Sequence, residues 1–389
     1  MNAPAPAPLA RIRVIELGHW VAGPAAGAVL ADWGADVIKV ETGSGDPMRA
    51  LFPPPPGSAA THAAGFSAVN RGKRSIDLDL ASDDGQATLA ELLAGADVFL
   101  TNLRPGALER LGLAPAAVAE QFPELVYCSV SAYGWDGEDR DVAGYDLAGF
   151  FGRAGVLHQL TPPGSVPSPY MSGLGDMFTA MSAVAGILAA VTERQHTGRG
   201  RFVEASLLRA GMWSMAGEMS MAANGKAPRP VADRSDSGSP LFNVYRSGDD
   251  RWFVLVGVEV HRHLPSVLAA IGRSDLLEDE RFTDARSIAS NRRAFIAILD
   301  ECFAQRDLAE WIEIFAEHDV WWGPVQSPVE VAADPQTVAA GAWVEYEGGA
   351  GRTVDAPIRF DHTNRSIVGD APVVGADTAA ILAELEGAP

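Results

Sequence analysis

The sequence contains few cysteines, no long apolar run and few basic residues. Its 389 residues include only Cys128 and Cys302, which cannot form a disulfide framework; this is typical of a reducing compartment, so we expect a cytoplasmic protein. No uninterrupted apolar run approaches about 18 residues, so we expect no membrane span. With 30 Lys+Arg against 50 Asp+Glu the net charge is −20, and this field opposes binding to nucleic-acid phosphates. Nucleic acid is therefore not an expected partner.

Several common site motifs are also missing. The stretch at residues 18–23 reads GHWVAG instead of G-x-G-x-x-G, which leaves a nicotinamide dehydrogenase as a weak alternative. The sequence has neither a phosphate-binding G-x-x-x-x-G-K-[ST] loop nor a G-x-S-x-G nucleophile elbow. His261 and His263 lie two residues apart, but no cysteine or carboxylate pattern completes a set of ligands around them. We therefore expect no metal site.

The first 210 residues alternate between short apolar segments and Ala/Leu-rich segments. This alternation predicts a doubly wound α/β domain with a parallel sheet. The predicted strands cover residues 12–17, 37–41, 74–78, 98–101, 125–130 and 202–205, and the main helices cover 22–33, 83–93 and 175–194.

The second half of the chain has a different character. Residues 224–240 are rich in Gly, Pro, Ser and Asp, which predicts a linker or loop. A hairpin is predicted from strands 242–245 and 252–256, followed by helices near 263–271, 291–304 and 307–317. Residues 322–361 are punctuated by Pro and Gly and are expected to be extended. The sequence thus predicts a second, smaller α+β domain.

One acidic residue has an unusual position. In the stretch GLGDMFTAM at residues 173–181, glycines precede Asp176, which opens a very apolar helix. The free N–H groups and the positive end of a helix dipole favour an ionised carboxylate at this point. The simplest alternative is that Asp176 only caps its helix, which is a common role for aspartate.

A series of motifs links this acid to a known family. In this order and at these separations, the chain resembles the class III CoA-transferases, the formyl-CoA and carnitine CoA-transferase family, which shares its fold with the α-methylacyl-CoA racemases. The motifs are ELGHWVAGP at 16–24, ADWGADVIKVE at 31–41, GDP at 45–47, NRGKRS at 70–75, NLRPGAL at 102–108, GD at 175–176, TGRG at 197–200 and GPV at 323–325.

The resemblance implies a domain layout and an assembly. It implies a large doubly wound, Rossmann-like CoA-binding domain formed by residues 9–223 with 326–389, and a smaller α+β domain at 241–325 after a linker at 224–240. It also implies a homodimer of two interlocked rings. No cofactor is implied beyond coenzyme A, which enters as the acyl-CoA substrate together with a carboxylic acid.

The resemblance also assigns roles to individual residues. Asp176 falls on the family's nucleophile, which attacks an acyl-CoA thioester and passes CoA to an acid through an aspartyl anhydride and an aspartyl-CoA thioester. The implied CoA contacts are Val21, Ala22, Arg71, Lys73, Arg74, Leu78, Asn102, Arg104 and Arg110. The implied substrate pocket contains His19, Trp20, Tyr133, Tyr145 and Gly175.

Two other functions remain open at this stage. The racemases of this fold carry a histidine base in a Gly-His-Asp stretch, whereas this chain has Tyr145 between Gly144 and Asp146. Because tyrosine has a pKa of about 10, it is a poor base near neutral pH, and the transferase is preferred. An α-methylacyl-CoA racemase or epimerase and a non-catalytic CoA-binding protein are the alternatives. Val21, in place of a glutamine of the formyl-CoA enzyme, suggests with Trp20 an apolar acyl pocket.

Overall fold

The structure is a computed structural model that describes residues 7–51, 61–168, 173–231, 233–349, 351–361 and 367–387. The chain divides into two compact units. The first comprises residues 1–158, 168–228 and 336–389, and the second comprises 159–167 and 229–335. The predicted small domain, 241–325, falls inside the second unit, and the predicted linker, 224–240, is divided between the two.

The first unit is built on a parallel sheet of six strands in the order β3-β2-β1-β4-β5-β6. The predicted α/β class with a doubly wound sheet is thereby confirmed. In such a sheet the loops diverge where the strand order reverses, here between β1 and β4, and ligands bind at the carboxyl ends of the strands there. The strands are β1 (Arg13–Leu17), β2 (Asp36–Glu41), β3 (Arg74–Asp77), β4 (Val98–Thr101), β5 (Val126–Ser131) and β6 (Phe202–Ser206).

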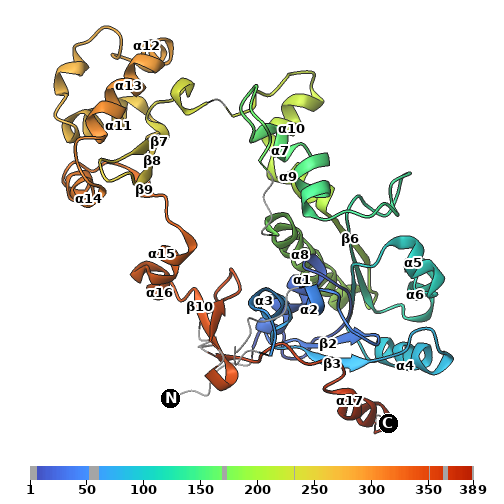
Figure 1. Cartoon of the computed structure of the whole chain (residues 1–389). Coiled ribbons are helices and arrows are strands. Elements are labelled where there is room, and N and C mark those ends of the chain that lie inside the picture. The colour runs from blue at the N-terminus through green and yellow to red at the C-terminus, as the bar shows by residue number, and fades with distance from the viewer. Residues whose placement is uncertain are drawn as a thin grey trace. The chain divides into compact units, whose positions relative to one another are not determined.

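Helices cover both faces of this sheet (Figure 1). Because side chains alternate along a strand, Val14 belongs to the core on one face and Ile15 to the core on the other. One face carries α1 (Ala22–Asp32), α3 (Ala64–Asn70) and α8 (Leu174–Thr197). The other carries α4 (Asp83–Ala94), α5 (Pro105–Arg110), α6 (Pro115–Gln121) and α17 (Thr378–Glu386).

Helix α8 is long and apolar enough to cross a membrane by length and composition. It packs, however, against α1, β5 and β6, as the central helix of its layer does in a doubly wound fold. Beside it lie the π-helix η1 (Leu147–Arg153) and helix α9 (Leu207–Ser214). The remaining helices of this part are α2 (Met48–Leu51), α7 (Val156–Gln159) and α10 (Ala216–Ala223).

The second unit is an α+β structure with an aromatic core. Its antiparallel sheet has the order β7-β8-β9, and Phe253 on β8 contacts the rings of Tyr245, Phe303 and Phe315. The strands are β7 (Phe242–Arg246), β8 (Trp252–Val256) and β9 (Trp322–Pro324). The helices are α11 (Val260–Ala270), α12 (Ala285–Ser290), α13 (Arg292–Phe303), α14 (Leu308–Glu317) and α15 (Pro328–Ala333).

The segment predicted to be extended also contains helices, so that expectation is wrong in part. Ser327 and Glu330 form a capping box that starts α15, with proline in its first turn. The later elements are α16 (Pro335–Ala339), β10 (Trp343–Tyr346), β11 (Arg352–Val354) and β12 (Ile367–Val368). Before α17, the Asp377 carboxylate accepts the Ser75 N–H at 2.8 Å instead of capping its own helix, which ties this helix to β3.

Candidate active site

Two acidic side chains meet at the N-terminus of α8. Gly173 precedes the helix with a φ of 72°, and Asp176 lies in its first turn. Asp146 immediately precedes η1, and its Cβ lies 3.0 Å from the position that a Cβ on Gly175 would occupy in the first turn of α8. A Cβ atom on Gly175 would lie 2.6 Å from Cβ of Phe150, so only glycine allows η1 to approach the helix this closely.

Asp176 does not cap its helix. No side-chain cap bond is present at the N-terminus of α8, and among the described residues the Asp176 carboxylate has no hydrogen-bond partner. Burial, reinforced by the negative charge of Asp146, raises the pKa of Asp176 to about 7. Desolvation thus opposes the helix N-terminus, which favours the ionised form of this carboxyl group.

The loop after β1 lies beside this helix end in a strained conformation. Trp20 has a φ of 65°, which is unfavourable for a bulky residue by about 1–3 kcal/mol. Its ring contacts that of Tyr145 edge-on, with centroids 5.4 Å apart. Val21 lies 3.6 Å from the position that a Cβ of Gly173 would occupy. Trp20, Val21 and Tyr145 thus form an apolar surface next to the two carboxyl groups.

Tyr133 lies next to the segment that carries Tyr145. Its hydroxyl oxygen lies 2.9 Å from the position of a Cβ on Gly144, the residue before Tyr145, and the Arg153 guanidinium covers its ring at 5.2 Å. Four of the five predicted pocket residues, Trp20, Tyr133, Tyr145 and Gly175, therefore lie on segments that adjoin one another.

Asn102 bridges the point where the strand order reverses. Its Oδ1 accepts the His19 N–H at 2.9 Å, and its Nδ2 donates to the His19 carbonyl at 2.6 Å. The amide thereby ties the loop after β1 to the end of β4, and this does not favour the prediction that it contacts CoA. His19, the fifth predicted pocket residue, contributes its backbone to this clamp, and burial lowers the pKa of its ring.

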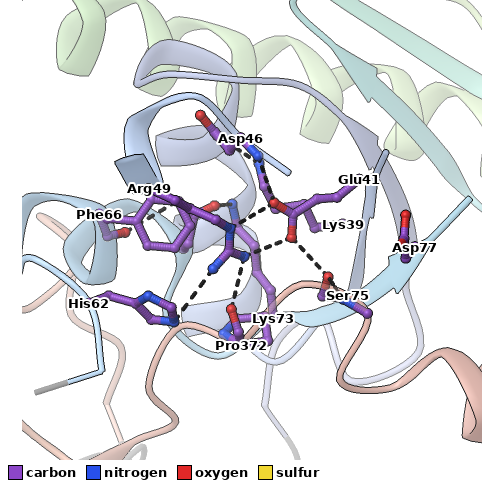
Figure 2. Close-up of polar contacts among 12 residues, drawn as sticks. Lys39, Glu41, Asp46, Arg49, His62, Phe66, Lys73, Ser75, Asp77 and Pro372 are labelled. Atoms are coloured by element: carbon purple, nitrogen blue, oxygen red, sulfur yellow. Dashed lines mark hydrogen bonds and ion pairs between the residues drawn. The ribbon is translucent and has the colours of Figure 1, made fainter. Parts of the chain in front are cut away.

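A buried group of charges supports the same loop. Lys39 is fully buried and donates to Glu16 at 3.1 Å and to the Gly18 carbonyl at 2.8 Å, and it pairs with Asp46 at 3.2 Å. Asp46 in turn accepts the Trp20 N–H at 3.2 Å. We call Glu16, Lys39, Asp46 and Lys73 the loop-support cluster; Figure 2 draws its Lys39, Asp46 and Lys73. Its side chains fix backbone groups on both sides of His19.

Lys73 belongs to this cluster. Its ammonium pairs with Glu16 at 2.8 Å and donates to the Pro24 and Val69 carbonyls, each at 2.9 Å. Its side chain is fully buried, and burial lowers its pKa to about 8. Because the ammonium already has partners inside the protein, this geometry does not favour the prediction that Lys73 binds a CoA phosphate.

The other predicted CoA contacts are arginines paired with carboxylates, apolar residues that are buried or half-buried, and two exposed arginines. Arg71 pairs with Asp32 at 2.6 Å, and Arg74 pairs with Asp36 at 2.7 Å and with Glu384, so carboxylates of the chain already offset both charges. Leu78 and Ala22 are buried in the cores of the two sheet faces and Val21 is half-buried, whereas Arg104 and Arg110 are exposed.

Arg49 and Glu41 form a separate ion pair (Figure 2). Arg49 donates to Glu41 at 2.7 and 2.9 Å and to the Pro372 carbonyl at 2.9 Å, and Ser75 donates to the same carboxylate at 2.8 Å. Glu41 therefore has no oxygen left for the ribose of a dinucleotide, which weighs against the dehydrogenase alternative. The described residues contain no group of three His, Cys, Asp or Glu side chains suited to a metal ion.

Sequence reasoning did not single out Asp146, Lys39 or Asp46 as parts of the site. Lys39 gave one local signal, because it is a charged residue inside the apolar run of β2. Asp46 stands in the motif at 45–47, and Asp146 follows Tyr145 directly. Nothing in the spacing indicated that these side chains serve the loop after β1 or the start of α8.

Comparisons with known proteins give consistent matches over nearly the whole chain. The model of CoA-transferase family III matches residues 9–378. The chain is 33% identical to the succinate–glutarate CoA-transferase of Agrobacterium fabrum, with 97% of this chain and 96% of that protein covered. It is 32% identical to the cinnamoyl-CoA:phenyllactate CoA-transferase of Clostridium sporogenes, with 96% and 92% covered. A solved CaiB/BaiF family protein from Brucella suis matches with a TM-score of 0.85 at 30% identity, covering 98% of this chain and 100% of that chain.

Proposed function

Because this chain belongs to CoA-transferase family III, as its motifs predicted, we propose that it transfers CoA from an acyl-CoA thioester to a carboxylic acid with Asp176 as the nucleophile. The observation that carries the assignment is the state of Asp176. This carboxylate has no hydrogen-bond partner among the described residues, and its pKa is raised to about 7. A more basic carboxylate is a better nucleophile, and an unpaired one is free to attack.

The proposed reaction proceeds through two kinds of covalent intermediate, an aspartyl anhydride and an aspartyl-CoA thioester. The ionised Asp176 attacks the thioester carbonyl, the carbon–sulfur bond breaks, and the electron pair leaves on CoA as thiolate. The thiolate attacks the Asp176 carbonyl of the resulting anhydride and releases the first acid. The acceptor carboxylate attacks the aspartyl-CoA thioester, which forms a second anhydride and releases CoA thiolate. The thiolate then attacks the acceptor carbonyl of this anhydride, which gives the new acyl-CoA and frees the Asp176 carboxylate. Each step exchanges one acyl bond for another, so no proton is consumed.

We propose an acyl group with an apolar body and a single carboxyl group. Trp20, Val21 and Tyr145 offer apolar surface beside the nucleophile. Among the described residues, Asp146 is the charged group that affects the pKa of Asp176, and it is negative. A second carboxylate on the acyl group would be repelled there, so a monocarboxylic acid with a branched or aromatic chain fits better than a dicarboxylic acid.

We also propose that the exposed Arg104 and Arg110 bind the CoA phosphates and that the protein is a homodimer with interlocked chains, as the family resemblance implies. Exposed apolar side chains support an assembly: Leu174 on α8 is 51% exposed and Trp213 on α9 is 73% exposed. Large exposed apolar groups of this kind mark protein interfaces. Stable, fully active monomers on dilution, measured by sedimentation, would contradict the dimer.

The test of the reaction is covalent trapping. The protein is incubated with a branched or aromatic acyl-CoA, treated with hydroxylamine or borohydride, and digested for peptide mass spectrometry. We expect modification at Asp176 in the wild type and none in Asp176→Asn. Asp83→Asn removes an exposed first-turn acid from α4 and serves as the matched control. CoA transfer that survives Asp176→Asn undiminished would overturn the proposal.

A further inference from the structure

Asp146 is the acidic residue whose charge acts on Asp176, yet no step of the proposed transfer reaction requires it. Its side chain is almost fully buried, with 7% of the residue exposed. Buried carboxylates are normally paired with a cation or fully hydrogen-bonded, because the desolvation of an unpaired charge is costly. Asp146 has no cation partner among the groups that affect its pKa. An arrangement of this kind requires a physical reason.

The start of η1 packs tightly against the first turn of α8. A Cβ atom on Gly175 would lie 3.0 Å from Cβ of Asp146 and 2.6 Å from Cβ of Phe150. Asp146 is therefore held beside the residue that precedes Asp176.

The second oxygen atom of Asp146 is unsatisfied. Oδ2 is buried and has no hydrogen-bond partner among the described residues. Its negative charge is therefore poorly compensated: burial raises the pKa of Asp146 itself, and the charge of Asp146 raises the pKa of Asp176. The titratable or charged groups of the packed elements are Asp176 at the start of α8, Arg153 on η1, which pairs with Asp139, and the exposed Arg209 on α9, while Glu193, Arg194 and His196 lie at the opposite end of α8.

We propose that Asp146 is a positioning residue that places a buried, uncompensated carboxylate beside Asp176, so that acylation of Asp176 is favoured. When Asp176 becomes an anhydride its charge passes to the CoA thiolate, and when it becomes a thioester the charge is on the released carboxylate of the first acid. The repulsion between the two carboxylates then disappears, and so does the desolvation of an ionised Asp176. The free-energy difference between the free enzyme and the covalent intermediates thereby becomes smaller. This inference rests on the proposed function.

The experiment compares wild type, Asp146→Asn and the control Asp136→Asn, which removes an exposed acid from the same segment. Asparagine keeps the shape of the aspartate side chain but carries no charge. The full-length proteins are equilibrated with a fixed ratio of acyl-CoA to CoA, and the fraction covalently modified at Asp176 is measured by mass spectrometry between pH 5.5 and 8.5. For Asp146→Asn we expect a fall of about threefold or more at pH 8, since half a pKa unit corresponds to about threefold.

A second expected result separates the effect of the Asp146 charge from a purely structural effect of the substitution. The midpoint pH of modification should move to lower values in Asp146→Asn and stay in place in Asp136→Asn. A purely structural role would lower the extent of modification without moving the midpoint, and that result would overturn the inference. The pH dependence of the unfolding free energy gives an independent readout, which should weaken in Asp146→Asn. If the wild type shows no modification at any pH, the proposed function fails, and the unfolding measurement still decides whether Asp146 acts on Asp176.

Discussion

The raised pKa of Asp176 makes a prediction about stability that needs no substrate. A carboxyl group whose pKa is higher in the folded than in the unfolded protein destabilises the fold when it ionises. This cost is absent below the unfolded pKa of about 3.9, grows as the pH rises, and is complete above the folded value of about 7. The nucleophile should therefore reduce the stability of its own protein at neutral and alkaline pH.

The size of the effect follows from the shift. An increase from 3.8 to about 7 corresponds to about 4 kcal/mol of destabilisation above pH 7, at about 1.4 kcal/mol per unit. At pH 5.5 only about half of this cost has developed. Asp176→Asn abolishes the charge, so we expect the variant to be more stable than the wild type at pH 8, and the gain to shrink by about 2 kcal/mol at pH 5.5.

The assay is urea unfolding followed by tryptophan fluorescence at the two pH values. Both lie above the isoelectric point of about 4.7, where precipitation would interfere. Asp83→Asn, the exposed first-turn acid of α4, is the control and should change the unfolding free energy by less than about 0.5 kcal/mol at either pH. A stability difference for Asp176→Asn that is the same at both pH values would refute the claim that this carboxyl group is desolvated.

Three further predictions concern the support of the loop after β1. A Cβ on Gly27 would lie 1.9 Å from the buried Glu16 carboxylate, so Gly27→Ala should destabilise by about 1–3 kcal/mol. The control Gly217→Ala, with open space around the added Cβ, should stabilise the protein by up to about 1 kcal/mol. Equal changes of Tm in the two variants would contradict this reasoning. Lys39→Met leaves a buried carboxylate unpaired and should lower the free energy of unfolding in urea by about 3–5 kcal/mol, whereas a loss below about 1 kcal/mol would argue against the cluster. Asn102→Ala removes both hydrogen bonds of the clamp and should lower kcat/KM for CoA transfer about tenfold or more; an unchanged value would show that the clamp does not position the loop.

The sequence predicted the sheet well because its signals are local. The strands of the six-stranded sheet lie within about one residue of the predicted ranges, since each is a short apolar run bounded by turn or cap residues. The capping boxes of α14 and α15 illustrate the same local encoding. The helices within 322–361 were missed because Pro and Gly there suggested breaks, whereas Pro328 starts a helix.

The partners of charged side chains could not be predicted in this way. Lys73 meets Glu16, which lies 57 residues earlier, and Arg74 meets Glu384 at the other end of the chain. A cluster of basic residues on an acidic chain suggested a phosphate site, but the fold brings a carboxylate to each of Arg71, Lys73 and Arg74. Only the tertiary arrangement determines whether a cation is free, and for the same reason the effect of Asp146 on Asp176 is not encoded in their spacing.

Three unfavourable features of the first unit lie around the start of α8, and together they are a physical argument for the site that is independent of any relative. Trp20 adopts a strained φ, Asp146 keeps a buried oxygen without a partner, and Asp176 is desolvated without a cation. Each of these lowers stability, and each persists only because surrounding groups enforce it. The loop-support cluster and the Asn102 clamp hold the loop after β1, while Phe150 holds the start of α8. Selection for stability alone would remove such features, so their concentration beside one carboxylate indicates that the chemistry takes place there.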